Sequence, residues 1–187
     1  VPTAWDGIIA GLLTGKYDII ISGMTITQER NLKINFADPY ISVGQTILAH
    51  KKHAGKKWSD LDKPEYTIVT KIGVTGEIAT RKMFKKAKIR TFETEADAAQ
   101  EVLNGNADGL VYDKPYNAIF FAEKGKDKLV HIDEELTYEP LGFAIRKGDP
   151  DFLNWLNNFL NQTKHDGTYK KIYDRWFTDT AWQKKVM

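Results

Sequence analysis

The chain has 187 residues, enough for one large or two small domains, and 42% of them are hydrophobic, as in ordinary folded proteins. It contains no cysteine, which excludes disulfides and thiolate metal sites. The formal net charge of +2 is too small to favour nucleic acid or an anionic membrane as a partner, and no apolar run approaches the roughly 18 residues that cross a bilayer.

The first predicted elements are a short helix and a strand. Apolar residues at helical spacing and the stop signal of Gly15 and Lys16 predict a helix over about residues 6–14. The apolar run that follows predicts a strand over 17–22. A helix and a strand in this order form the second half of a βαβ unit, so a first strand should end near Val1. We therefore expect the opening half of this unit to lie outside the sequence.

Further along the chain, strands and helices alternate. Runs of β-branched residues bounded by turn or charged residues predict strands over 44–52, 66–73, 89–92, 107–113, 129–132 and 141–147. Helix start and stop signals predict helices over 77–87, 95–106, 114–125, 149–167 and 168–177. The apolar face of the helix over 149–167 consists of Phe152, Leu153, Leu156, Phe159 and Leu160. This alternation predicts an α/β fold with parallel sheets, whose ligands bind beyond the carboxyl ends of the strands.

The stretch SGMTITQER, residues 22–30, leaves the strand predicted over 17–22. Gly23 allows a ligand to approach the backbone closely, and Thr25 adds a hydroxyl and an amide. Thr27 is a candidate N-cap, which places Arg30 and free N–H groups where they could bind an anion. Arginine suits a carboxylate because its planar fork donates two parallel hydrogen bonds. The alternative is a capped strand-to-helix turn with a solvated arginine.

Two other strand ends carry candidate ligand contacts. In KIGVTGE, residues 71–77, the backbone N–H groups near Gly73 and Gly76 could bind the same anion, although two glycines in a loop usually indicate only a turn. In GLVYDKPYN, Asp113 ends an apolar strand and could pair with an ammonium group. Its alternative role is to cap the helix that begins at Pro115. A carboxylate contact and an ammonium contact together describe a receptor for an amino acid.

Four segments, spread over the whole chain, occur in an order that is typical of one family. They are WDGIIAGLLTGKYDIIISGMTITQERNLKINFADPYI, GEIATRKMF, VYDKPYN and HDGTYKKIYDRWF. With them the sequence resembles the periplasmic or lipid-anchored polar amino-acid-binding proteins of ABC importers, such as lysine/arginine/ornithine-, histidine- and glutamine-binding proteins. The resemblance implies an α/β, two-lobe, periplasmic-binding-protein-like (type II) fold with two hinge strands. Residues 1–45 and 138–187 would form lobe 1, and residues 46–137 would form lobe 2.

The resemblance also implies a set of ligand-binding residues, namely Trp5, Gly23, Met24, Thr25, Arg30, Thr75 and Asp113. Arg30 would bind the α-carboxylate of the ligand together with the amides of Thr25 and Thr75. Asp113 and the carbonyl of Gly23 would hold the α-ammonium group, while Trp5 and Met24 would line the side-chain pocket. The expected ligand is a free L-amino acid, polar or cationic by preference. No catalytic residue, metal or cofactor is expected.

The resemblance further implies partners and a location. A protein of this family delivers its amino acid to the permease of an ABC importer, is periplasmic or lipid-anchored outside the cell, and binds no nucleic acid. Its members carry an extra strand and helix before the first residues of this sequence, so lobe 1 is expected to be incomplete and lobe 2 complete. We expect that the missing segment was removed, is not observed, or is replaced by a partner chain or a swapped segment.

Two other functions remain open from the sequence. An enzyme similar to cyclohexadienyl dehydratase could use the same scaffold, since fold does not fix function. Such an activity needs a general acid or base in the cleft. Among the positions matched to the family, Arg30 and Asp113 are ionisable and already assigned to the ligand, and no histidine is present. The other possibility is the ligand-sensing domain of a larger receptor, which a signalling domain in the full gene would favour.

The remaining charged and aromatic residues have structural interpretations. The basic run HKKHAGKK, residues 50–57, is expected to be a solvated loop rather than a nucleic-acid contact. Beyond the nearby pair His50 and His53, which lacks a third ligand, His131 and His165 show no metal-ligand spacing. Surface positions are expected for Glu77, Glu93 and Glu95. Packing in a helical core is expected for Trp155, Trp176 and Trp182.

Overall fold

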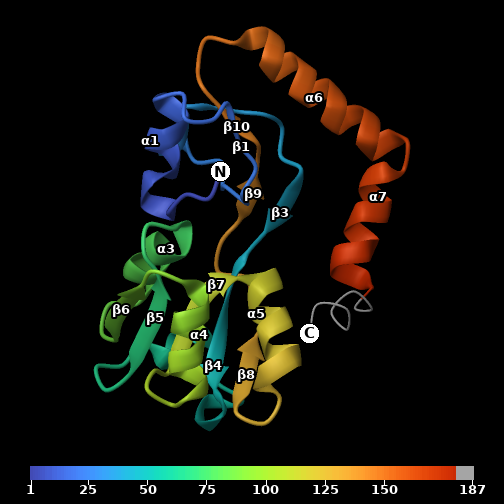
Figure 1. Cartoon of the computed structure of the whole chain (residues 1–187). Helices are drawn as coiled ribbons and strands as arrows, with labels where there is room; N and C mark the ends of the chain where they lie inside the picture. The colour runs from blue at the N-terminus through green and yellow to red at the C-terminus, as the bar shows by residue number, and fades with distance from the viewer. Residues whose placement is uncertain (180–187) are drawn as a thin grey trace. The chain divides into compact units, whose positions relative to one another are not determined.

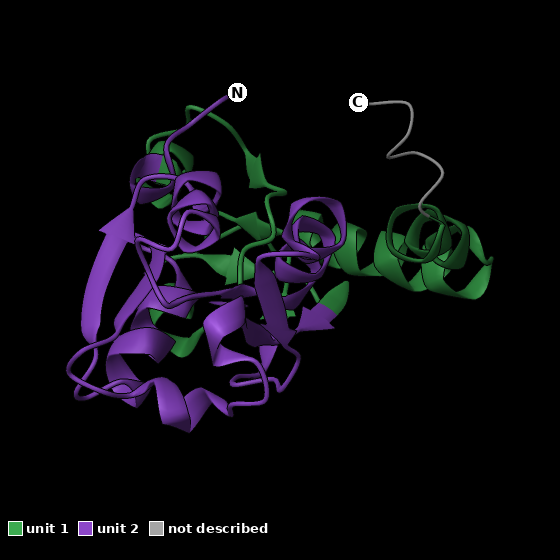
Figure 2. Cartoon of the chain, turned by 90° about the horizontal axis from the view of Figure 1, so that it is seen from below, with its two compact units in different colours: residues 1, 8–41, 140–187 green, residues 2–7, 42–139 purple. Residues whose placement is uncertain are grey.

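The computed structural model of the chain describes residues 1–179, so Trp182 lies outside the described residues. The backbone forms two compact units (Figures 1 and 2). Unit 1 comprises Val1, Ile8–Ile41 and the segment from Pro140 onward, and unit 2 comprises Pro2–Gly7 and Ser42–Glu139. The chain passes between the units through the strands β3 (Ile41–Val43) and β9 (Glu139–Leu141), which pair with each other.

Unit 2 is built around a five-stranded sheet (Figure 1). In the spatial order β6-β5-β7-β4-β8, its strands are Lys88–Phe92, Thr67–Lys71, Gly109–Asp113, Gln45–His50 and Leu129–Ile132. Its α-helices are α3 (Thr75–Met83), α4 (Glu95–Leu103) and α5 (Lys114–Phe120). Shorter helical turns are η1 (Trp5–Gly7), η2 (Lys51–His53), η3 (Trp58–Leu61) and the π-helical η4 (Phe121–Gly125).

Strand direction in this sheet is mixed. β5 is parallel to β6 and β7, as the alternation of strands and helices predicts, but β4 is antiparallel to β7 and β8. The prediction of parallel sheets was therefore wrong for β4. This strand continues from β3 and runs opposite to β7, so that Gln45 pairs with Asp113. A short buried apolar run has the same pattern in either direction, and the sequence alone does not distinguish them.

The two faces of the unit 2 sheet bury different residues because side chains alternate along a strand. On one face, Leu48 and Leu110 are fully buried in a cluster with residues of α4 and α5. On the other face, Ile47 and Val111 are fully buried in a cluster with Leu61 of η3. Because both faces of the sheet are packed, its strands are held in fixed register. The polar residues described below lie at the ends of these strands.

The basic run at residues 50–57 is not a solvated loop throughout, because His53 within it is buried. His53 is 1% exposed, and its Nε2 lies 2.8 Å from Oδ1 of Asp108. The Nζ of Lys52 lies 2.7 Å from the same oxygen, and the Nζ of Lys56 lies 3.1 Å from Nδ1 of His53. Burial lowers the pKa of His53, against the hydrogen bond to Asp108. The solvated-loop prediction was wrong for His53 because its carboxylate partner lies 55 residues away in the sequence.

Unit 1 contains a three-stranded sheet in the order β1-β10-β2, with strands Ile19–Ile20, Ala144–Ile145 and Asn35–Phe36, all paired antiparallel. Parallel pairing was predicted, so the prediction was also wrong for this sheet. The reason is the one given for β4, namely that short apolar runs look the same in parallel and antiparallel strands. The helices of this unit are α1 (Ile8–Leu13), α2 (Gln28–Asn31), α6 (Pro150–His165), α7 (Thr168–Tyr173) and the π-helical η5 (Asp174–Thr178). Helix α6 buries Leu156 and Leu160 in a cluster with Ala37 and Ile145.

Several aromatic residues of the C-terminal helices are exposed rather than buried. The exposed fractions of Trp155, Phe159 and Trp176 are 61%, 44% and 46%. Trp155 stacks on Phe152 and Phe159 at ring-centroid distances of 6.2 and 6.0 Å. The prediction of a core position was wrong for Trp155 and Trp176. For Trp155 the reason is geometric, because it precedes the buried Leu156 by one position and so points about 100° away around the helix.

Candidate functional site

Polar residues gather where the parallel strands of unit 2 end. β5, β6 and β7 run in the same direction, so Lys71, Phe92 and Asp113 close their strands at one edge of the sheet. β4 runs in the opposite direction, and its first residue, Gln45, therefore lies at the same edge. Helix α4 begins there at Glu95. Open α/β sheets bind their ligands beyond this edge.

Asp113 is the central residue of this edge. It occupies the N-cap position of α5, yet its side chain makes no capping hydrogen bond within the described chain. Its Oδ1 instead accepts a hydrogen bond from Nε2 of Gln45 at 2.6 Å. Burial raises the pKa of Asp113 to about 6 against the Gln45 hydrogen bond, and the charges of Glu139 and Glu95 also raise it. A carboxylate released from capping and held in a partly desolvated position suits the binding of a cation.

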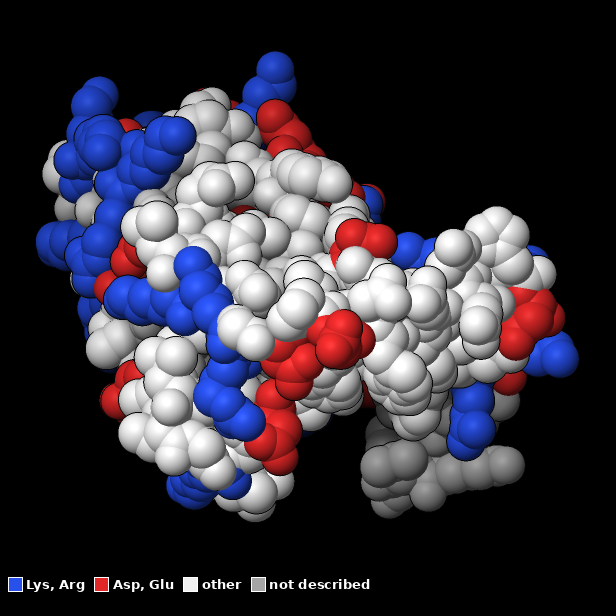
Figure 3. Space-filling model, turned by 90° about the horizontal axis from the view of Figure 1, so that it is seen from above, with Lys and Arg blue, Asp and Glu red and all other residues white. Residues whose placement is uncertain are grey.

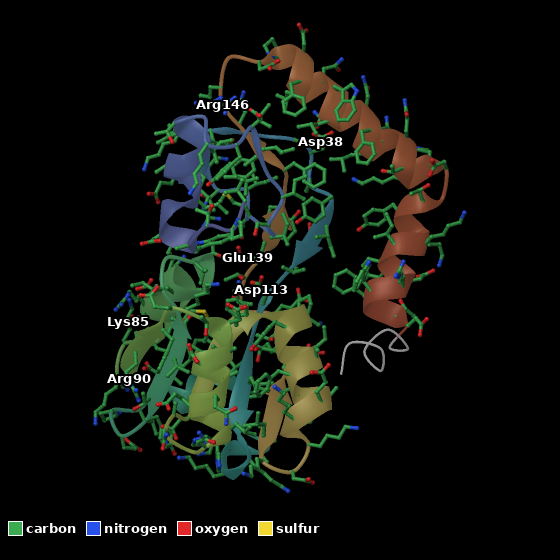
Figure 4. All side chains as sticks on the ribbon, in the orientation of Figure 1. Asp38, Lys85, Arg90, Asp113, Glu139 and Arg146 are labelled. Atoms are coloured by element: carbon green, nitrogen blue, oxygen red, sulfur yellow. The ribbon has the colours of Figure 1, made fainter. Side chains whose placement is uncertain are left out.

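The groups around Asp113 are mostly acidic. Figure 4 shows Glu139 above Asp113 at the end of β7, and Glu139 is 4% exposed. Glu95 forms an ion pair with Lys71, whose Nζ lies 2.8 Å from Oε2 of Glu95. Burial opposes the ionisation of Glu95, but the hydrogen bonds from Lys71 and from its own backbone lower its pKa. Three carboxylates face one lysine here, and such an excess attracts a positively charged ligand.

The loop between β5 and α3 holds Gly73 and Thr75. Gly73 has a φ of 74°, which glycine adopts without strain. Its carbonyl accepts a hydrogen bond from Nε1 of Trp5 at 2.9 Å, and its N–H donates to Oε2 of Glu77 at 2.8 Å. Glu77 therefore accepts from one of the N–H groups that the sequence analysis assigned to an anion. The prediction of a plain surface carboxylate was incomplete for Glu77, because its side chain binds this loop. Thr75 is the half-buried first residue of α3.

In unit 1, the predicted N-cap at Thr27 is confirmed. Its Oγ1 accepts a hydrogen bond from the N–H of Arg30 at 3.1 Å and so caps helix α2. The guanidinium of Arg30 folds back on the preceding loop, where Nη1 donates to the carbonyl of Thr25 at 2.9 Å. Thr25 is 7% exposed and forms a bridge with Leu141. These contacts hold the half-buried Arg30 beside the loop that carries the other unit 1 candidates.

Gly23 and Met24 precede Thr25 in this loop. Gly23 has a φ of 64°, in the left-handed region. The side chain of Met24 is 1% exposed and belongs to the interior of unit 1. The Met24 carbonyl accepts a hydrogen bond from the N–H of Gly142 at 3.0 Å. The loop is thus fixed by its own backbone conformation and by its contacts with the segment around Leu141.

Replacing Gly23 by alanine is expected to lower the free energy of unfolding by about 1–2 kcal/mol, because a side chain disfavours the left-handed conformation. Space does not limit this substitution, since a Cβ at Gly23 would meet only Leu141 Cδ1, at 3.9 Å. Gly7 is the matched control, because it has no positive φ and its Cβ would meet only Thr3 Cγ2, at 4.0 Å. Urea denaturation checks the prediction, and equal losses for Gly23→Ala and Gly7→Ala would refute it.

The seven residues proposed from the sequence fall into two groups. Unit 1 holds Gly23, Met24, Thr25 and Arg30, and unit 2 holds Trp5, Thr75 and Asp113. The lobe boundaries at residues 45 and 138 stay predictions, and Pro2–Gly7 belongs to unit 2, where Trp5 contacts Gly73. Sequence reasoning missed the roles of Gln45, Lys71, Glu95 and Glu139. Lys71 lies near the end of the strand predicted over 66–73 and Glu95 begins the helix predicted over 95–106, so attention to every charged residue near a strand end could have found both.

Two other kinds of feature, a metal site and a membrane-spanning helix, were sought among the described residues. Residues 1–179 contain no group of three or more potential metal ligands. No helix in that range is both long and apolar enough to cross a bilayer. Figure 3 shows most of the visible lysine and arginine side chains on the left of that view, with acidic side chains beside them and nearer its centre.

Solved structures share this fold. One is a putative binding component of an ABC transporter from Wolinella succinogenes DSM 1740 complexed with lysine, which is 61% identical with a TM-score of 0.95 over 98% of this chain and 80% of that one. Another is the ancestral amino acid-binding protein AncCDT-1, a precursor of cyclohexadienyl dehydratase, which is 52% identical with a TM-score of 0.87 over 95% of this chain and 76% of that one. The molecule therefore has the type II periplasmic-binding fold, and the predicted fold class is confirmed.

The chain belongs to the bacterial extracellular solute-binding proteins, family 3, which it matches over residues 1–179. A probable histidine-binding protein of Neisseria gonorrhoeae is 34% identical over 188 residues, which cover 96% of this chain and 68% of that protein. The chain spans about two thirds of the length of the first curated relatives. The family resemblance inferred from the sequence is confirmed.

Proposed function

We propose that the protein captures a free L-amino acid outside the cytoplasm and delivers it to the permease of an ABC importer. Membership of an extracellular solute-binding family supports this function, as do similar proteins described as binding lysine or histidine. Asp113 is the residue on which the proposal depends, because its carboxylate is free of capping and lies at the ligand edge of the unit 2 sheet. A periplasmic or lipid-anchored location completes the proposal.

Each unit supplies the charged partner for one charged group of the ligand, and a backbone group of the other unit adds to each contact. Arg30 of unit 1 binds the α-carboxylate, helped by the amides of Thr25 and Thr75, because a guanidinium donates two parallel hydrogen bonds to a carboxylate. Asp113 of unit 2 accepts from the α-ammonium group, together with the carbonyl of Gly23. A ligand that contacts both units stabilises the conformation in which both contacts exist, so binding shifts the protein toward a closed state.

A cationic amino acid is the preferred ligand. Asp113, Glu95 and Glu139 give the unit 2 edge an acidic excess over Lys71. Unlike a neutral amino acid, lysine or arginine carries a second positive charge that this excess attracts. The 61% identical protein from Wolinella succinogenes was crystallised with lysine, which agrees with this choice.

The protein acts as a receptor and not as an enzyme in this proposal. The ancestral protein at 52% identity is described as amino acid-binding and as a precursor of a dehydratase, so the scaffold is compatible with both functions. Binding uses the charge of Asp113 to hold an ammonium group, whereas a dehydratase needs a general acid or base that transfers a proton to its substrate. Prolonged incubation with a cyclohexadienyl substrate would separate the two functions, because a dehydratase converts such a substrate and a receptor leaves it unchanged.

A thermal-shift screen of the twenty amino acids on the full-length protein tests the proposed function. Lysine or arginine at 100 times its dissociation constant is expected to stabilise the folded protein by about 2.7 kcal/mol. Titration calorimetry then gives the affinity and a stoichiometry of one ligand per chain. The proposal would be contradicted if none of the twenty amino acids stabilised the protein.

A further inference from the structure

Gln45 is held rigidly beside Asp113. Its side chain is 1% exposed, and the register of β4 and β7 places the two residues directly opposite each other. Directly paired residues project from the same face of a sheet, which explains the 2.6 Å hydrogen bond from Nε2 of Gln45 to Oδ1 of Asp113. The backbone of Gln45 is fixed as well, because its N–H donates to Thr137 Oγ1 and its carbonyl accepts from the N–H of Leu136.

The other end of the Gln45 amide has an unusual environment. Its Oε1 is buried and has no hydrogen-bond partner among residues 1–179. A Cβ built on Gly76 would lie 2.9 Å from this oxygen, so only a glycine leaves it room. A buried carbonyl oxygen without a partner is unfavourable, and a residue that served packing alone would not need an amide here. The contact with Asp113 is the interaction that offsets this cost.

We propose that Gln45 is a positioning residue that holds the Asp113 carboxylate ionised and oriented, and thereby sets the pH below which the protein releases its ligand. This inference rests on the proposed function, in which Asp113 receives the α-ammonium group. Gln45 acts through Asp113 and need not touch the ligand. An uncharged donor suits this task, because a lysine in its place would neutralise Asp113 and compete with the ligand.

The charged groups that face Asp113 come from three elements. Glu139 of β9 and Glu95 of α4 oppose its ionisation, while Lys71 of β5 favours it. Burial raises the pKa of Asp113 to about 6, and the hydrogen bond from Gln45 acts in the opposite direction. Loss of this bond would therefore move the protonation of Asp113 toward neutral pH. A protonated Asp113 carries no charge for an ammonium group, so affinity must fall as the proton binds.

The test compares Gln45→Met with the exposed control Gln100→Met in the full-length protein. The affinity for L-lysine is measured by calorimetry between pH 5 and pH 8. In the wild type, affinity is expected to fall by about tenfold per pH unit below the midpoint near 6. Gln45→Met should raise this midpoint by about one pH unit, and Gln100→Met should leave it unchanged. An unshifted midpoint in Gln45→Met would overturn the positioning role.

Gly76→Ala provides a second variant that keeps Gln45 in place. Its new Cβ, 2.9 Å from Oε1, should displace the amide and raise the midpoint in the same direction. The ¹³C shift of the Asp113 carboxyl, followed against pH without ligand, measures the same effect independently of binding. An equal midpoint in the wild type and both variants would exclude the inference. Failure of the wild type to bind any amino acid at pH 8 would instead overturn the proposed function.

Discussion

Replacing Arg30 by alanine is expected to weaken lysine binding by about 2–5 kcal/mol, because the substitution leaves the α-carboxylate desolvated without its charged partner. Arg30→Lys should recover only part of this loss, since an ammonium group does not offer the paired donors of a guanidinium. Titration calorimetry at pH 8 gives both values. Binding of Arg30→Ala at wild-type affinity would show that the carboxylate is held elsewhere.

Two measurements separate binding from folding in the Arg30 experiment. Arg30 also donates to the Thr25 carbonyl within unit 1, so its removal affects the loop that carries this residue. Thermal unfolding without ligand reports that structural effect by itself. Arg90→Ala is the matched control, because Arg90 is 51% exposed and pairs with Glu101 on the surface of unit 2. Its affinity for lysine should remain within about 0.5 kcal/mol of the wild type.

Asp113→Asn is expected to weaken lysine binding by a similar amount, about 2–5 kcal/mol, because the ammonium group loses its carboxylate. The same substitution should stabilise the ligand-free protein at pH 7 by about 1–3 kcal/mol. This stabilisation is expected because the pKa of Asp113 is raised to about 6 from an ordinary 3.8. The folded protein therefore disfavours the ionised carboxylate. Ionised Asp113 is thus a cost to folding, which ligand binding would compensate in the proposed function.

The pH dependence of this stabilisation follows from the sign of the pKa shift. Between pH 3.8 and about 6 the folded wild type binds more protons than the unfolded chain, so its stability falls as pH rises through this window. The advantage of Asp113→Asn should be complete above pH 6 and absent below about pH 3.8. Urea denaturation at several pH values checks this, with the exposed Asp127→Asn as control. An advantage that stays constant over the whole range would indicate a packing effect instead.

Much of the fold could be predicted from the sequence because local signals were strong. Thr27 was predicted to cap a helix, and its hydroxyl accepts from Arg30 as expected. Pro115 was predicted in the first turn of the helix after Asp113, where the structure has it. Periodicity does not reveal which strands pair or in which direction, so β4 and the unit 1 sheet were predicted to be parallel and are antiparallel.

The candidate site was predicted only in part for the same reason. Asp113 could be found because a carboxylate at the end of an apolar strand is a local signal. Gln45 gave no such signal, since it begins a strand that looks like any other and meets Asp113 only through antiparallel pairing 68 residues away in the sequence. Glu139 likewise gains its role from the position of β9. His53 was expected in solvent because its partner Asp108 lies 55 residues away in the sequence.

The most direct test of the whole account is a cycle that removes, for each proposed ion pair, the charged group on the protein, the charged group on the ligand, or both. Calorimetry measures the binding of lysine, of 6-aminohexanoate, which lacks the α-ammonium group, and of 1,5-diaminopentane, which lacks the carboxylate. We expect Asp113→Asn to bind lysine and 6-aminohexanoate equally weakly, and Arg30→Ala to bind lysine and 1,5-diaminopentane equally weakly, since each pair has lost one shared contact. Losses that simply add within each pair would contradict the assignment of Arg30 to the carboxylate and Asp113 to the ammonium group.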